Sequence, residues 1–209
     1  FNLQFKLKSY NALNQPQNDT VLKYQNRYFI HQDTLVKFKE EPQSYERAYL
    51  GYVIFALDRN LFSDKRDISS FGYTAATIYS NVNVEIDKKM AKAYKQILAE
   101  SGMNEERDET LKLARLENYL KENYFVSELE SDAMYDLASI LQNHTMNEFG
   151  ALRLYHTLFK FAGFPNQLVF TSEKSTTPFD PDFENNIMLR EELLYFTQQN
   201  VFMSPTNIT

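Results

Sequence analysis

The sequence contains, from Thr145 to Phe164, the stretch Thr-Met-Asn-Glu-Phe-Gly-Ala-Leu-Arg-Leu-Tyr-His-Thr-Leu-Phe-Lys-Phe-Ala-Gly-Phe. As a helix, this stretch places apolar side chains on nearly every side. Its polar side chains fall along one narrow stripe of Arg153, His156, Thr157 and Lys160. We therefore expect a central helix with other elements packed around most of it, with Thr145 as N-cap and Gly163 just past its end.

Helices and one strand are predicted around this central helix. The run Gln167–Ser172 that follows it is typical of a strand. Three stretches before it carry apolar residues at helical spacing, and Gly102 is a stop signal after the first of them. These stretches are Asp87–Ala99, Glu106–Tyr124 and Asp132–Asn143.

The first part of the chain has the pattern of a β structure. Residues 1–8 alternate apolar and polar side chains, as a half-buried strand does. Short strands are predicted over 24–30 and 34–39, with His31 in the turn, and a polar loop over 11–19. The apolar run 48–57 suits a strand covered on both faces, although periodicity alone does not exclude a helix. Residues 58–70 are charged and predicted to be a connection.

Charge changes along the chain together with this pattern. Residues 1–60 hold 8 Lys or Arg and 6 Asp or Glu, whereas residues 61–209 hold 14 and 22. We therefore expect two modules joined by a connection over 63–74. The first is the C-terminal part of a β-rich domain over 1–62, and the second is a helix-rich module over 75–209. Because the sequence begins at Phe1 in strand-like alternation, we interpret it as a piece of a longer protein.

Composition limits the classes of function. The net charge of -6 and the pI near 5.2 argue against a surface for nucleic acid or an anionic membrane. With no Cys, the chain forms no disulfide, thiolate metal site or cysteine nucleophile. No segment reaches the roughly 20 apolar residues of a membrane-spanning helix. No phosphate-binding loop is present, and no cofactor is predicted.

A family resemblance follows from the order of elements and three anchors. Ala162-Gly163-Phe164 closes the central helix, a strand follows, and Phe183 and Ser204-Pro205-Thr206 come later. This order resembles the transglutaminase-like superfamily, which has a papain-like core. It is most similar to the form that follows an all-β domain in large bacterial proteins, many from Bacteroidetes. The resemblance implies an α+β fold: the end of a β-sandwich-like domain, then a helix-rich core with a small antiparallel sheet. It also implies a periplasmic or cell-envelope location.

The resemblance places three catalytic positions on this chain. In that family a Cys opens the central helix as the nucleophile, a His follows in a Phe-Asn-His-type strand, and an Asp in an Asp-Pro-Thr-type segment. Glu148 takes the Cys place, Asn185 (or Asn186) the His place, and Ser204 the Asp place. All three depart from the pattern. The resemblance therefore implies a degenerate triad and a catalytically inactive module that binds a peptide, a glycan or another protein.

The residues themselves allow other roles. Thr145 and Glu148 have the spacing of a capping box, which makes Glu148 a structural residue. The alternative is a hydrolase or acyl transferase with a non-standard site around Glu148 as general base. A metal site at His144, Glu148 and His156 is another hypothesis, and it requires that the three ligands converge. Asp180, Asp182 and Glu184 suggest calcium, but the Gly and the regular ligand spacing of a calcium loop are absent. A structural spacer in an envelope protein is a further alternative.

Overall fold

The computed structural model describes residues 3–22, 25–34, 50–172 and 179–206. It divides into two compact units. Unit 1 comprises Phe1–Ala76 and Thr171–Glu191, and unit 2 comprises Thr77–Phe170 and Glu192–Thr209. The strand predicted over 34–39 lies, apart from its first residue, outside the described residues. The domain boundaries predicted from the sequence stay a prediction.

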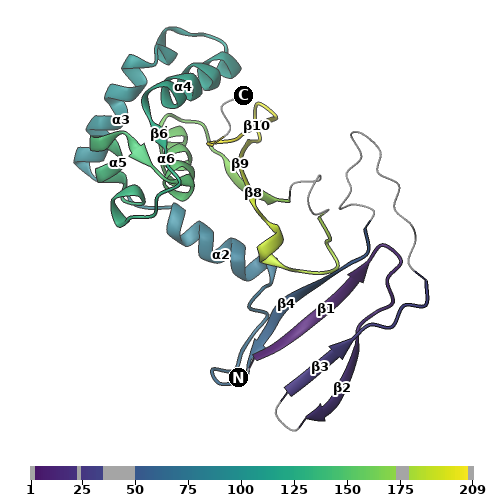
Figure 1. Ribbon diagram of the computed structural model, residues 1–209. Helices are drawn as coiled ribbons and strands as arrows, with labels where there is room; N and C mark the ends of the chain where they lie inside the picture. Colours follow the sequence, from purple (N-terminus) through teal and green to yellow (C-terminus); the bar gives the residue numbers. More distant parts are fainter. Residues whose placement is uncertain (1–2, 23–24, 35–49, 173–178, 207–209) are drawn as a thin grey trace. The chain divides into compact units, whose positions relative to one another are not determined.

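Unit 1 contains two small sheets (Figure 1). In the first, β4 (Tyr52–Asn60) is the middle strand and pairs antiparallel with both β1 (Leu3–Tyr10) and β5 (Lys65–Arg66). In the second, β2 (Gln17–Leu22) and β3 (Gln25–Phe29) form an antiparallel pair. The strands predicted near residues 1–8, 24–30 and 48–57 are confirmed. Strand β2 begins inside the segment predicted as a loop, and the β-sandwich stays a prediction.

Asp180 joins the later part of unit 1 to strand β1. Its carboxylate accepts hydrogen bonds from Lys8 Nζ at 2.6 Å and from the Tyr10 hydroxyl at 2.5 Å. Burial by itself would raise the pKa of Asp180, but these hydrogen bonds outweigh it and the pKa is lowered. Tyr10 also stacks on Tyr52 of β4, with ring centroids 4.9 Å apart. The Asp180 carboxylate, a predicted calcium ligand, is thus held by a cation and a hydroxyl.

Unit 2 contains the helices, and three of them match the stretches predicted before the central helix. These are α3 (Lys88–Glu100), α4 (Glu109–Asn123) and α5 (Leu137–Asn143), the last preceded by a short 3-10 turn, η2 (Asp132–Met134). A second 3-10 turn, η1 (Met103–Glu105), follows α3. Helix α2 (Phe71–Val82), which was not predicted, runs from unit 1 into unit 2.

Aspartates fix the starts of these three helices. Asp87, Asp108 and Asp136 are their N-caps, and each carboxylate accepts a backbone N–H of the first turn. Gly102 has φ 68° after α3, a left-handed conformation that glycine adopts without strain, so the predicted stop is confirmed.

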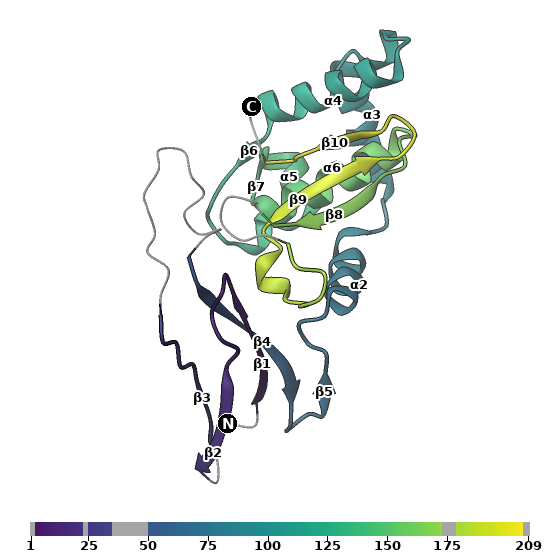
Figure 2. The ribbon, with the colours of Figure 1, turned by 90° about the vertical axis from the view of Figure 1, so that its right-hand side faces the viewer.

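Helix α6 (Glu148–Phe161) lies at the centre of unit 2, with α3, α4 and α5 on one side and a sheet on the other (Figures 1 and 2). Nine of its residues are buried, and Leu154, Tyr155 and Phe159 are fully inaccessible. Its apolar sequence therefore produces the buried central helix that was predicted. Gly163, with φ 90°, follows the C-cap Ala162 as expected.

The sheet of unit 2 has three strands in the order β10-β9-β8. They are β8 (Gln167–Thr171), β9 (Glu191–Phe196) and β10 (Val201–Met203), with β9 and β10 antiparallel. A separate two-stranded parallel ladder joins β6 (Phe125–Val126) to β7 (Thr145–Met146). The predicted strand at 167–172 is confirmed. Asn185, which the resemblance places in a strand, instead caps a 3-10 turn, η3 (Asn186–Met188). The chain is therefore a mixed α and β protein.

Candidate functional site

The start of α6 is built differently from the predicted capping box. The N-cap is Asn147, whose Oδ1 accepts the backbone N–H of Gly150 at 2.8 Å. Thr145, the predicted N-cap, lies in strand β7, paired with Phe125 of β6. Glu148 is the first residue of the helix rather than the third, so it does not reach back to close a capping box. The predicted Thr145–Glu148 box is therefore wrong.

The segment before α5 holds this helix start closely. Asn147 is only 3% exposed, and its Nδ2 donates to Glu130 Oε2 at 3.1 Å. A Cβ atom added at Gly150 would lie 2.1 Å from the backbone oxygen of Met134. Glycine at 150 is thus required for the close approach of η2 to the first turn of α6.

Glu148 places an exposed carboxylate at the positive end of the α6 dipole. The structure adds Glu192, in strand β9, as a residue that the sequence analysis did not select. Burial raises the pKa of Glu192 to about 7, and the negative charge of Glu148 acts in the same direction. The signal available in the sequence was Glu191-Glu192 directly before the apolar run Leu-Leu-Tyr-Phe, but it did not reveal the proximity to Glu148.

The other two predicted positions have local partners. Asn185 is 2% exposed; its Nδ2 donates to the Phe55 backbone oxygen at 3.2 Å, and its Oδ1 accepts from Ile187 N at 3.1 Å. Ser204 follows β10, and its hydroxyl lies 3.5 Å from that of Thr206. Asn185 belongs to unit 1, whereas Glu148 and Ser204 belong to unit 2. Convergence of the three positions stays a prediction.

The polar stripe of α6 is buried rather than solvated at its centre. His156 is 2% exposed, and burial lowers its pKa. The Asn166 amide nitrogen donates to the backbone oxygens of His156 and Phe164, so its Oδ1 faces His156 Nδ1 at 2.7 Å. Nδ1 therefore carries the proton, and Nε2 is a buried acceptor with no partner among the described residues. His156 is therefore a buried residue with a fixed hydrogen-bond partner rather than a solvated one.

The remaining stripe residues also have partners inside unit 2. Arg153 donates to the Tyr135 backbone oxygen at 2.6 Å and lies over the Phe149 ring. Thr157 donates to the backbone oxygen of Arg153 at 2.7 Å and lies 2.6 Å from the buried hydroxyl of Tyr94. The stripe thus joins α6 to its neighbours.

His144 is exposed at the end of α5 in a left-handed conformation, stacked on Tyr124 with ring centroids 4.5 Å apart. Burial raises the pKa of Tyr124 to about 12. Within 3–22, 25–34, 50–172 and 179–206, no three His, Asp or Glu residues are grouped as a metal site would require. Across the same ranges, no helix is long and apolar enough to cross a membrane.

Comparison with known proteins gives one distant structural likeness. The chain is similar to a crystal structure of a TGase, with 13% sequence identity and a TM-score of 0.42 over 82% of this chain and 50% of that one. The chain thus spans about half the length of that protein. No protein-family model matches the sequence, and no curated protein matches it.

Proposed function

We propose that this chain is a catalytically inactive transglutaminase-like module that binds a peptide, a glycan or another protein within a larger bacterial protein. The observation that carries the proposal is the chemistry at the start of α6. A carboxylate, Glu148, occupies the first helical position of a chain that has no Cys.

Thiol-dependent acyl transfer requires a thiolate and a base that activates it. Glu148 does not provide a thiolate. Glu192, whose pKa is raised by burial and by the charge of Glu148, is a second acid rather than an imidazole. The backbone N–H of Gly150, which could stabilise a developing anion, is occupied by Asn147. These features favour a helix start that stabilises the fold.

Turnover assays test the proposal. The purified chain is incubated with glutamine-containing peptides and a primary amine, and the peptide masses are followed over an extended incubation. We expect neither amine incorporation nor deamidation nor cleavage above a protein-free blank. Product that accumulates in proportion to the protein concentration would contradict the proposal.

The acidic pair favours one second candidate: a hydrolase with a non-standard site around Glu148. With its pKa raised to about 7, Glu192 is partly protonated at neutral pH and could act as a general acid. Glu148, exposed at the helix start, could act as the base. Such catalysis uses a pair of carboxyl groups, one as the acid and one as the base.

The pH dependence of any turnover distinguishes this candidate. A Glu148–Glu192 mechanism predicts a bell-shaped rate profile whose alkaline limb falls near pH 7 and disappears in Glu192→Gln. Activity without that limb would belong to other residues, and Glu191→Gln is the matched control in the adjacent position.

A further inference from the structure

Helix α3 carries four lysines, Lys88, Lys89, Lys92 and Lys95, and all four are exposed. In the described part of the chain none of them has an ion-pair partner. The basic residues of α4 differ. Lys112, Arg115 and Lys121 each lie within 3.2 Å of a carboxylate oxygen.

The lysines of α3 form a row in an otherwise acidic unit. Lys88, Lys92 and Lys95 are separated by one helical turn each and lie on one side of the helix, about 10 Å from first to last at 1.5 Å per residue. Outside α3, unit 2 holds 6 Lys or Arg and 14 Asp or Glu. The row is therefore a local positive surface on a negative background.

An apolar groove runs beside this row. It has a volume of about 390 Å³ and lies between α3 and α5. Met90 and Ala93 of α3 and Ala138 and Leu141 of α5 form its apolar lining. Lys89, next to the row on the helix, and Gln142 complete the lining with polar groups. A groove of this size is within the range that proteins use to bind ligands.

We propose that this groove binds a short segment of a partner protein in which acidic and apolar residues are interleaved. Its apolar side chains lie in the groove against Met90 and Leu141, and its carboxylates pair with Lys89, Lys92 and neighbouring lysines. Several charges spaced along α3 match a segment with several acidic groups in a line better than a ligand with one anionic group. The residues that line this groove do not include Glu148, so turnover assays do not bear on it.

Fluorescence anisotropy tests the proposal with a dye-labelled peptide that repeats Glu-Glu-Leu-Leu. We expect saturable binding that weakens as salt is added, because exposed ion pairs are screened. A peptide in which Ser replaces Leu, and one in which Gln replaces Glu, should each bind at least about tenfold more weakly.

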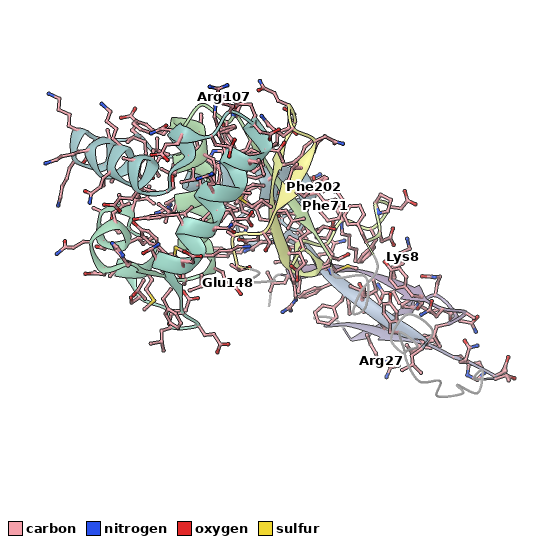
Figure 3. All side chains as sticks on the ribbon, turned by 90° about the horizontal axis from the view of Figure 1, so that it is seen from above. Lys8, Arg27, Phe71, Arg107, Glu148 and Phe202 are labelled. Atoms are coloured by element: carbon pink, nitrogen blue, oxygen red, sulfur yellow. The ribbon has the colours of Figure 1, made fainter. Side chains whose placement is uncertain are left out.

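Three variants locate the binding. Lys92→Glu reverses one charge of the row, and Ala93→Leu fills part of the groove; each should weaken binding by about tenfold or more. Arg107→Glu makes the same charge change at an exposed position before α4, labelled in Figure 3, and should leave binding within about twofold after its general charge effect. Circular dichroism of each variant checks that the fold is kept.

Four outcomes overturn the proposal. In the first, the Glu-Glu-Leu-Leu peptide fails to bind. In the second, Lys92→Glu and Ala93→Leu bind it as well as the unaltered chain does. In the third, the peptide in which Ser replaces Leu binds equally well, which would show an effect of charge alone. In the fourth outcome, sedimentation shows self-association that Ala93→Leu abolishes, which would make a second copy of this chain the occupant.

Discussion

Helices α6 and α3 of unit 2 differ in whether their polar side chains have partners within the chain. On α6, Arg153, His156 and Thr157 are each hydrogen-bonded to a group of the chain itself. On α3, the lysines have no ion-pair partner among the described residues and face solvent. The polar side chains of α6, the helix that the sequence singles out, therefore stabilise the fold, whereas the lysines of α3 are free to contact a ligand.

This difference has a thermodynamic consequence. Polar groups buried with partners specify one arrangement of the core, and losing a partner costs stability. Exposed lysines contribute little to folding, so substitutions there should change binding without changing stability. Changes that remove a hydrogen bond of a buried polar group on α6 should lower the free energy of unfolding, whereas changes at the exposed lysines of α3 should not.

The largest expected effect is at Gly150. In Gly150→Ala the new Cβ would clash with the Met134 backbone oxygen, and a backbone atom cannot move aside as the end of a flexible side chain can. We therefore expect the free energy of unfolding, measured by chemical denaturation, to fall by about 3 kcal/mol. Gly72→Ala is the matched control, because nothing lies within 4 Å of its added Cβ. It should be neutral or stabilising by about 0.5 kcal/mol. Equal losses in both variants would contradict the close approach at Gly150.

The next effect separates the two possible caps of α6. Asn147→Ala removes the acceptor for Gly150 N–H and the donor to Glu130, and should cost about 1–2 kcal/mol. Thr145→Ala removes only a contact of 3.3 Å to the Asn143 backbone oxygen and should stay within about 0.5 kcal/mol of the unaltered chain. Thermal melts of both variants measure the difference, and the reverse order would restore Thr145 as the cap.

A smaller effect concerns two buried tyrosines. Tyr94→Phe loses a hydrogen bond of 2.6 Å to Thr157 and should cost about 1 kcal/mol. The hydroxyl of Tyr155 is buried without a partner in the described part of the chain, so Tyr155→Phe should be neutral or slightly stabilising. If Tyr155→Phe proved the more harmful change, its hydroxyl would have a partner that this account lacks.

The last effect is a change in pH dependence. Because the folded pKa of Glu192 is raised from 4.5 to about 7, its contribution to stability is present below pH 4.5 and lost as pH rises to about 7. Glu192→Gln should remove this loss, so the difference in Tm between variant and unaltered chain should grow from pH 5 to pH 8. His156, whose lowered pKa acts in the opposite sense, is present in both proteins and cancels. A difference that is constant with pH would show that Glu192 titrates normally.

The sequence predicted α6 well because its signal is internal: an apolar run on nearly all sides forces burial whatever packs around it. It predicted the wrong cap because Thr145 and Asn147 are both good N-caps two residues apart. The choice was made by a distant partner, since pairing with Phe125 draws Thr145 into a strand.

Contacts distant in the sequence also explain the other errors. The burial of His156 was not visible in the sequence, because its partner, Asn166, lies beyond the end of the helix. Glu192 was missed because its raised pKa depends on burial in a strand and on Glu148, which is far from it in the sequence. The α3 lysines were visible in the sequence, but only the structure shows the apolar groove beside them. It also shows that basic residues of α4, such as Arg115, are paired with carboxylates.

The most direct test asks whether Glu148 does chemistry or only begins a helix. Turnover of the glutamine-peptide and amine mixture and the Tm are measured together for the unaltered chain and for Glu148→Gln (Figure 3 labels Glu148). We predict no turnover by either protein. The Tm values of the two proteins should differ by no more than the shift that corresponds to a stability change of about 0.5 kcal/mol. Turnover by the unaltered chain that disappears in Glu148→Gln, with the Tm unchanged, would contradict the account.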